Sequence, residues 1–332
     1  MHHGEVAARN AHACHGFVIT SRAEPEHTLR TSDPAAYPQC VRKRSVAMLV
    51  IAGTMHFALS TPGAAGPPAG LVEPRLAAVE TFALALGVDL DRSRVVERLR
   101  AYDLVVLDGE TASSSLVSEL QSGGTIVLGY LSVGTIERGR SWTGEAKPYR
   151  LDHWDDWDEW YADVASPSFR ALIADTVAPS ILDRGFDGLF LDNVDMISTH
   201  PRQANGMVRL VTDLFRITHN QDDMLFAQNG EDVIKPMLGA LDGWNREDVS
   251  GTYDFDQGRY VEQRPGDKRG ALDALRRLAA RGLFVTATDY FAADDTAGAA
   301  AATANACAAG ARSFVSGIDL ARLPVSPPRC PR

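Results

Sequence analysis

Cysteine and histidine are scarce in this chain, and their scarcity argues against several kinds of site. The 332 residues contain four Cys and nine His, and beyond residue 65 only two Cys and three His remain. There is no HExxH motif and no Cys/His cluster, so we expect no metal ligands and no cofactor. His153, His200 and His219 have no companion at ligand spacing, and the polar residues that follow the predicted strands include no histidine for a Ser-His-Asp triad.

Positive charge is also in short supply. The chain has 33 Lys and Arg against 43 Asp and Glu, which gives a formal net charge of −10. Nucleic-acid binding needs basic patches, so we expect no nucleic-acid partner. An acidic protein is compatible with a cationic or neutral ligand.

Long apolar runs are missing except near the N-terminus. The run at 46–59 follows three basic residues at 42–44 and precedes a small-residue stretch, STPGAAGPPAG. This order predicts a secretory signal peptide at 41–65, and the run is short for a bilayer span. We therefore expect a secreted protein without a stable membrane anchor; the alternatives are an apolar helix of a longer N-terminal region and an uncleaved anchor.

The flanking segments are assigned from composition. Residues 1–40 are polar and aperiodic, and we expect them to be a non-native or disordered extension. Residues 66–76 are expected to be a linker, and 324–332 a Pro-rich C-terminal tail. Cys307 and Cys330 can form a disulfide that fixes this tail in an exported protein, although their spacing is equally compatible with two unpaired thiols.

From residue 77 to 323 the chain has short apolar runs that alternate with helical stretches. Candidate strands are 81–86, 104–107, 125–131, 188–191, 224–227, 241–244, 283–288 and 312–316. Candidate helices between them are 113–121, 168–183, 206–218, 268–281 and 296–309. This alternation predicts an α/β fold, a single-domain (β/α)8 TIM barrel, and we expect a monomer. The alternative is an open doubly wound sheet, but no Gly-rich phosphate loop follows the first strand.

The most informative stretch is GFDGLFLDNVD at 185–195. A short apolar run leads into two carboxylates, Asp192 and Asp195, with Asn193 between them. Continuous apolar runs are typical of strands that are covered on both faces. An acid at the C-terminal end of a barrel strand lies where barrel active sites are built, so the stretch predicts an enzyme site.

Polar residues also follow the other predicted strands, and acids, amides and tyrosines predominate. They are Asp108, Glu110, Tyr130, Ser132, Gln228, Asn229, Glu247, Asp248, Asp289 and Tyr290. Glycoside hydrolysis needs two carboxyl groups that flank one bond. Asp192 and Glu247 follow the fourth and sixth strands and can face one cavity, whereas a lone strand-end acid is as well explained as a loop or helix cap.

The stretch WDDWDEW at 154–160 interleaves tryptophans with acids. Aromatic faces can stack on sugar rings, but a spacing of three also places residues on one helix face. We therefore favour core packing for at least two of these three tryptophans. Arg140 and Trp142, which follow Glu137, are candidates for the site but can equally fix a loop by ion pairing and stacking.

Six motifs together resemble one family. They are YLSVGTIERGRSW at 130–142, EWYADVAS at 159–166, GFDGLFLDNVD at 185–195, AQNGED at 227–232, DGWNRED at 242–248 and TDYF at 288–291. In this order they resemble glycoside hydrolase family 114, the endo-α-1,4-polygalactosaminidase-like (β/α)8 barrels, and its bacterial extracellular relatives. The resemblance covers about residues 78–320.

The resemblance implies a retaining glycosidase that cleaves an α-linked, galactosamine-containing polysaccharide. It assigns Asp192 as the nucleophile and Glu247 as the general acid/base. Sugar-cleft positions fall on Asp108, Tyr130, Asn229, Asp289 and Tyr290, and Asp195 either binds sugar or steadies its loop. Two alternatives remain: a carbohydrate-binding barrel without turnover, and a magnesium-dependent hydrolase that uses the strand-end acids as ligands.

Overall fold

The computed structural model describes residues 73–331. The expected extension at 1–40, the signal peptide at 41–65 and most of the linker at 66–76 lie outside the described residues. Between residues 73 and 331, no helix combines the length and the apolar character that crossing a bilayer requires.

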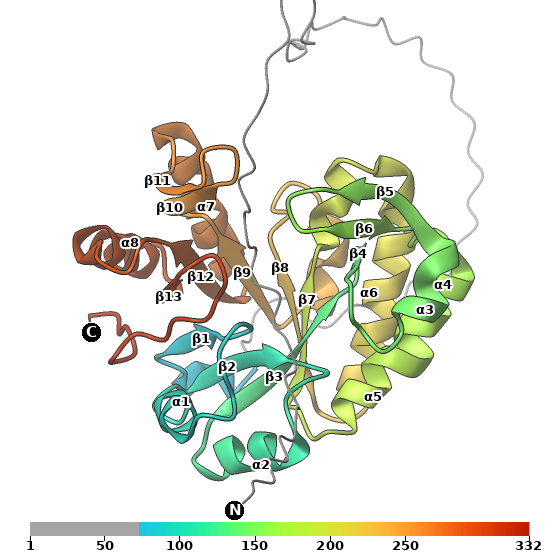
Figure 1. Cartoon of the computed structure of the whole chain (residues 1–332), viewed down its shortest axis with the longest axis horizontal. Helices are drawn as coiled ribbons and strands as arrows, with labels where there is room; N and C mark the ends of the chain where they lie inside the picture. Colours follow the sequence, from blue (N-terminus) through green and yellow to red (C-terminus); the bar gives the residue numbers. More distant parts are fainter. Residues whose placement is uncertain (1–72, 332) are drawn as a thin grey trace, which may run out of the picture. The chain divides into compact units, whose positions relative to one another are not determined.

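Eight parallel strands form one sheet that curves into a near-closed barrel (Figure 1). In order around the sheet they are β1 (Phe82–Leu84), β2 (Leu104–Asp108), β3 (Ile126–Ser132), β7 (Gly188–Asp192), β8 (Met224–Gln228), β9 (Gly243–Glu247), β12 (Phe284–Tyr290) and β13 (Arg312–Ser316). The first and last strands meet through the rings of Phe82 and Phe314, whose centroids are 6.3 Å apart. The predicted (β/α)8 barrel and its eight strands are confirmed.

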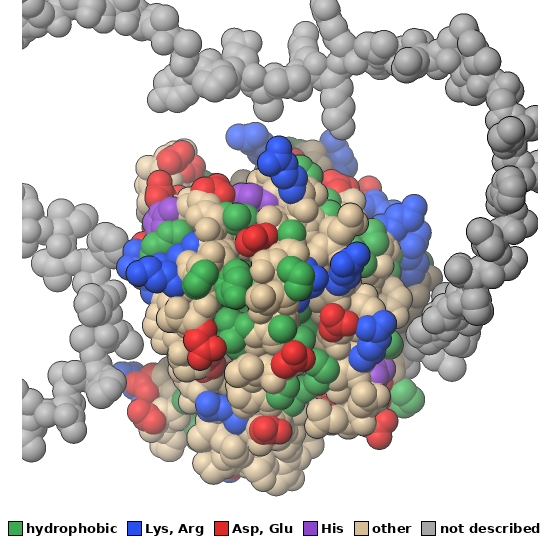
Figure 2. Space-filling view, turned by 90° about the vertical axis from the view of Figure 1, so that its right-hand side faces the viewer, with side chains coloured by type: hydrophobic (Ala, Val, Ile, Leu, Met, Phe, Trp, Pro, Cys, Tyr) green, Lys and Arg blue, Asp and Glu red, His purple; other side chains and the backbone are tan. Residues whose placement is uncertain are grey.

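Helices follow most of the strands and surround the barrel (Figure 1). They are α1 (Ser93–Leu99), α2 (Ser114–Ser122), α3 (Thr143–Ala146), α4 (Pro167–Leu172), α5 (Ala178–Leu182), α6 (Ala204–His219), α7 (Pro265–Ala279) and α8 (Thr296–Ala308). Shorter helical turns are η1 (Leu76–Ala78), η2 (Lys147–Tyr149), η3 (Ile173–Val177, a π-helical turn), η4 (Val194–Ser198), η5 (Pro201–Gln203) and η6 (Lys235–Ala240). On the face shown in Figure 2, acidic, basic and apolar side chains are interspersed, so this face carries no continuous basic surface.

The apolar runs form strands because both faces of the sheet are covered. Every residue of β3 is buried, and so are the first four residues of β2 and β7. Gly188 begins β7 at φ 146°, and a Cβ atom there would lie 2.1 Å from the carbonyl oxygen of Met224. Glycine is therefore required where β7 approaches β8.

Six of the barrel strands extend one to three residues further than predicted at their C-terminal ends. Asp108, Asp192 and Glu247 are the last residues of β2, β7 and β9, and Asp289 lies within β12. The prediction ended each strand where its apolar run ended, but the backbone pairing continues into the acids; Glu247, for example, is still paired with Thr288. The acids are therefore held by the sheet itself and do not lie on loops.

Two small sheets at the mouth of the barrel were not predicted. β4 (Thr135–Ile136), β5 (Arg150–Trp154) and β6 (Glu159–Ala162) form one, and β10 (Gly251–Asp254) and β11 (Arg259–Glu262) form the other. The helical interpretation of the tryptophan spacing at 154–160 is therefore wrong, because these residues form the β5–β6 hairpin.

The C-terminal tail is fixed to the barrel. Cys307 of α8 and Cys330 form a disulfide, with Cα atoms 5.3 Å apart. Arg329 forms an ion pair with Glu80, beside the start of β1. Arg322 donates a hydrogen bond of 2.6 Å from Nη2 to the carbonyl oxygen of Phe291.

Candidate active site

A cavity of about 370 Å³ lies at the C-terminal ends of the barrel strands. Of the residues predicted for the site, seven line this cavity: Asp108, Tyr130, Asp192, Asp195, Asn229, Glu247 and Tyr290. Active sites of β/α barrels are built at this end. The topology therefore brings together residues that are up to 182 positions apart in sequence (108 to 290).

Asp192 is held by three donors. The hydroxyl of Tyr130 donates to Oδ2 at 2.7 Å, while the backbone N–H of Asn193 and Nε2 of Gln228 donate to Oδ1 at 2.7 and 3.0 Å. Burial raises the pKa of Asp192, and these three hydrogen bonds act in the opposite direction by stabilising the charged carboxylate. The donors also fix the orientation of the carboxyl group toward the cavity.

A polar layer inside the barrel supports this arrangement. Nδ2 of Asn245 donates to Oε1 of Gln228 at 2.8 Å, so the Gln228 amide is oriented with its NH2 group toward Asp192. The hydroxyls of Thr286 and Thr288 donate to Oδ1 of Asn245 at 2.8 and 3.2 Å. Three neighbouring strands therefore cooperate to orient one carboxylate.

Glu247 has two side-chain donors and two negative neighbours. Nδ2 of Asn229 donates to Oε2 at 2.9 Å, and the hydroxyl of Tyr290 donates to Oε1. Burial, followed by the charges of Asp192 and Asp248, raises the pKa of Glu247 to about 8. Glu247 therefore carries a proton at neutral pH, as a general acid must.

Three non-glycine residues that follow strand ends have left-handed backbones. Asn193 follows β7 at φ 58°, Asn229 follows β8 at φ 58° and Asp248 follows β9 at φ 54°. Such a conformation is unfavourable for most side chains and is tolerated best by Asn and Asp. It turns the chain sharply at the barrel mouth, directly after the residues that face the cavity.

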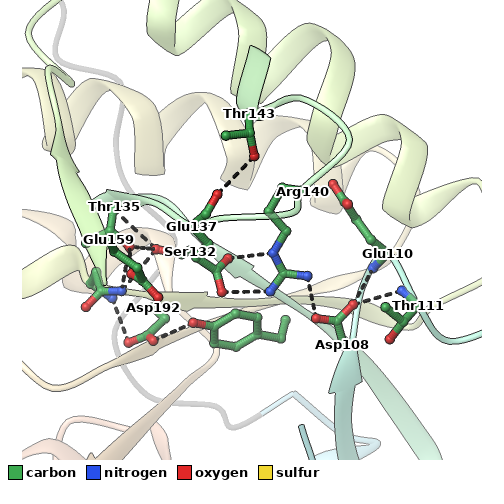
Figure 3. A network of polar contacts seen from close by, with 12 residues as sticks. Asp108, Glu110, Thr111, Ser132, Thr135, Glu137, Arg140, Thr143, Glu159 and Asp192 are labelled. Atoms are coloured by element: carbon green, nitrogen blue, oxygen red, sulfur yellow. Dashed lines mark hydrogen bonds and ion pairs between the residues drawn. The ribbon is translucent and has the colours of Figure 1, made fainter. Parts of the chain in front are cut away.

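Asp108 is engaged by an arginine. Arg140 forms an ion pair with Asp108 and donates two hydrogen bonds of 2.8 and 2.7 Å to Glu137 (Figure 3). Burial acts to raise the pKa of Asp108, but the Arg140 charge and hydrogen bond outweigh it and the pKa is lowered. The predicted loop-fixing role of Arg140 fits this geometry, and the three side chains also form part of the cavity wall.

Glu159, at the start of β6, was not predicted as a site residue. Its Oε2 accepts a 2.6 Å hydrogen bond from the hydroxyl of Thr135, and the side chain lines the cavity (Figure 3). Burial and then the charge of Glu137 raise its pKa to about 7. The motif EWYADVAS begins with this residue, so the motif was visible in the sequence but the cavity contact was not.

Asp195 lines the cavity from η4. Burial and the charge of Asp192 raise its pKa to about 6. Asp289 is placed differently: it is fully buried and is not part of the cavity lining. Its Oδ1 accepts from the backbone N–H groups of Ser250 and Gly251, which is an arrangement that supports β10 and favours a positioning role over sugar contact.

Trp154 and Trp157 also line the cavity, contrary to the preference for core packing. The ring of Trp154 stacks on that of Tyr161, with centroids 5.4 Å apart, and the Trp157 side chain is 43% exposed. Trp160 instead packs under two guanidinium groups, those of Arg138 and Arg150. The three-residue spacing of these tryptophans in the sequence did not indicate which side of the hairpin each ring occupies.

Within 73–331, no group of three or more His, Cys, Asp or Glu side chains has an arrangement that could hold a metal ion. The acids of the cavity are instead spread around its wall, and several are engaged by donors from neighbouring side chains.

Comparisons with known proteins agree with this architecture. The glycoside hydrolase domain of PelA from Pseudomonas aeruginosa has a similar structure, with a TM-score of 0.65 and 24% identity over 74% of this chain and 98% of that domain. Ega3 of Aspergillus fumigatus, in a crystal structure with galactosamine, gives a TM-score of 0.61 and 19% identity over 79% of this chain and 96% of Ega3. A search of the curated proteins finds no match.

The family assignment comes from the sequence. Residues 62–321 match the glycoside-hydrolase family GH114. This match spans most of the chain and includes the whole barrel with both carboxyl groups of the cavity. The chain therefore belongs to glycoside-hydrolase family GH114 and is a glycosidase.

Proposed function

We propose that the protein is a secreted, retaining glycosidase that cleaves an α-linked, galactosamine-containing polysaccharide. Asp192 acts as the nucleophile and Glu247 as the general acid/base. The observation that carries the proposal is the contrast between these two carboxyl groups in one cavity. Asp192 is surrounded by donors that favour its charged form, whereas burial and the charges of its neighbours keep Glu247 protonated.

The proposed reaction follows from these protonation states. Asp192 attacks the anomeric carbon while Glu247 donates its proton to the leaving glycosidic oxygen, which gives a covalent glycosyl-enzyme and a shortened chain. Glu247, now a carboxylate, then takes a proton from water as the water oxygen attacks the anomeric carbon and releases Asp192. Both groups return to their starting states.

The charge of the cavity supports an amino-sugar substrate. Among the described residues that line it, seven are acids and Arg140 is the one base: the acids are Asp108, Glu137, Glu159, Asp192, Asp195, Glu247 and Asp319. Arg140 is already engaged by Asp108 and Glu137, so the remaining lining favours a cation such as the ammonium group of galactosamine. The structural neighbour Ega3 is known in complex with galactosamine.

The test is incubation of residues 66–332 with partly deacetylated α-1,4-polygalactosamine, with reducing ends measured over time. We expect cleavage by the wild type and a loss of at least about 10³-fold in Asp192→Asn and Glu247→Gln, because each removes one half of the acid pair. Retention of the anomeric configuration is tested by NMR of the first product that is released. If either variant equals the wild type, or if the first product has the inverted configuration, the mechanism is wrong.

A non-catalytic carbohydrate-binding barrel is the second candidate. It would use the same acids as acceptors for sugar hydroxyls, and it predicts binding of the polymer without any product. A magnesium-dependent hydrolase would lose activity in a chelator, whereas the proposed mechanism predicts no change. Secretion is tested separately, by sequencing the N-terminus of the exported protein; a start near residue 66 is expected.

A further inference from the structure

Two hairpins at the mouth of the barrel resemble one another. β5 and β6 are joined by a four-residue turn at 155–158, and β10 and β11 by a four-residue turn at 255–258. The last residue of each turn has a left-handed backbone: Asp158 at φ 54° and Gly258 at φ 62°. Both hairpins lie at the same end of the barrel in Figure 1.

The tip of each hairpin presents one exposed aromatic ring between two aspartates. Trp157 lies between Asp156 and Asp158, and Phe255 between Asp254 and Asp256. Of the described residues, three large apolar side chains are exposed, and these two rings are among them at 43% and 40%. Exposing such rings to water is unfavourable, so a pair of them that is exposed together indicates a binding surface.

The two rings meet. Their centroids are 5.3 Å apart, with the planes at 68°, so Trp157 and Phe255 join the hairpins edge to face. The hairpins leave the barrel after β3 and β9, strands that are separated in the sheet by β7 and β8. β7 carries Asp192, and Trp157 itself lines the cavity. The aromatic pair is therefore continuous with the cavity of the acid pair.

We propose that Trp157 and Phe255 form a distal subsite that stacks against a sugar ring of a cationic polysaccharide whose chain extends out of the cavity. The apolar face of a sugar ring fits the aromatic surface, and a ring that carries an ammonium group is also attracted by the aromatic faces and by the flanking aspartates. The inference rests on the proposed function for the identity of the chain. It adds a site beyond the carboxyl pair.

Tyr253 and Tyr260 extend the aromatic surface that Trp157 and Phe255 form. Tyr253 packs against both Phe255 and Tyr260, with centroids 5.1 Å apart in each case. The hydroxyl of Tyr260 accepts a 3.2 Å hydrogen bond from the backbone N–H of Ile318, and Ile318 lines the cavity. These contacts hold the β10–β11 hairpin, and so Phe255, at a fixed place on the rim.

The experiment measures binding in the Glu247→Gln background, where turnover is expected to be slower by at least about 10³-fold. The probes are long α-1,4-polygalactosamine chains and a purified disaccharide, and dissociation constants come from calorimetry. Phe255 does not line the cavity, so Phe255→Ala should weaken binding of the long chain about fivefold, the effect of one exposed aromatic–cation contact, and leave the disaccharide unchanged. Trp157→Ala should weaken binding of the long chain at least as much. Phe255→Trp, which keeps an aromatic ring at this position, should bind the long chain as tightly as the parent does.

Val325→Ala is the matched control, because Val325 is an 85% exposed apolar residue of the C-terminal tail. It should change neither constant. The inference is overturned if Phe255→Ala weakens both probes equally or neither, since the ring would then serve only to join the hairpins. The inference is also overturned if Phe255→Ala lowers the melting temperature but leaves long-chain binding unchanged.

The two proposals fail in different ways. If the wild type cleaves the polymer but Phe255→Ala binds long chains as the parent does, only the distal subsite is wrong. If the wild type cleaves nothing while the Glu247→Gln protein binds long chains through Phe255, only the catalytic proposal is wrong. If the polymer is neither cleaved nor bound, both are wrong.

Discussion

At the scale of single residues, the two carboxyl groups of the cavity are distinguished by their neighbours. Asp192 has three hydrogen-bond donors, while Glu247 has two side-chain donors and a pKa that is raised by burial and by the charges of Asp192 and Asp248. Two neighbouring buried carboxyl groups cannot both become charged without a cost in free energy. The proton of the pair therefore resides on Glu247 near neutral pH.

Glu247 must be protonated to act as the acid, so kcat/KM should fall as the pH rises past about 8. Tyr290→Phe removes a hydrogen bond that lowers the pKa of Glu247, so it should move this alkaline limb to higher pH. Asp248→Asn removes a negative charge that raises the same pKa, so it should move the limb to lower pH. Rates from pH 4 to 10 provide the measurement, and shifts in the same direction would contradict the assignment of Glu247.

The sequence identified seven cavity residues because their strands end in acids, amides and tyrosines. It did not identify Glu159, because the contact of this residue with Thr135 joins positions that are 24 apart and depends on the β4–β6 pairing. It also placed Asp289 with the cleft residues, since a strand-end acid looks the same whether it faces the cavity or caps β10. Side-chain direction depends on packing that the sequence alone does not supply.

At the scale of elements, the barrel strands were predictable and the hairpins were not. The strands are continuous apolar runs, a pattern that reflects burial on both faces. The β5–β6 hairpin is instead rich in acids and tryptophans, and it contacts residues outside it: Arg138 packs over Trp160, and β4 pairs with β6. The structure of this segment is therefore determined by partners from elsewhere in the chain.

Arg140 connects two elements, since it joins Asp108 at the end of β2 to Glu137 after β4. These side chains are 13% to 16% exposed, so Arg140→Ala leaves two mostly buried carboxylates without their cation. We expect the free energy of unfolding to fall by about 3–5 kcal/mol, measured by urea unfolding. Arg216→Ala, which breaks an exposed pair on α6, should cost no more than about 0.5 kcal/mol; an equal loss in both variants would contradict this account.

At the scale of the whole molecule, the disulfide closes a loop between α8 and the tail. Cys307 and Cys330 are 23 residues apart, and a cross-link of this length stabilises a protein by about 3 kcal/mol, mainly by restricting the unfolded chain. Cys307→Ser combined with Cys330→Ser should lower the melting temperature by several degrees. A reducing agent should lower that of the wild type similarly and leave the double variant unchanged. A double variant as stable as the wild type would contradict the prediction.

The buried acids make the stability of the fold depend on pH. Burial raises the pKa of Asp195 and Asp289 to about 6, of Glu159 to about 7 and of Glu247 to about 8. Acids whose pKa is raised on folding contribute stability that is complete below their unfolded pKa and is lost as the pH rises through the folded value. The free energy of unfolding should therefore decrease from pH 5 to pH 8.5.

Urea unfolding at intervals of half a pH unit measures this dependence. Glu159→Gln is the internal control, because it removes a group whose pKa rises to about 7 on folding and should flatten the curve between its ordinary pKa and pH 7. A free energy of unfolding that is constant or increases over the range would show that these carboxyl groups are more solvated than their positions indicate.

The tail also determines how the protein can be shortened for laboratory work. Ile318, Asp319 and Leu320 form part of the cavity wall, and the segment 322–330 anchors them through Arg322 and Cys330. The family match ends at residue 321, so a recombinant version cut there would keep every catalytic candidate yet lose the anchor of one wall. Expression vectors should therefore extend through Cys330, and an affinity tag is best separated from it by a spacer.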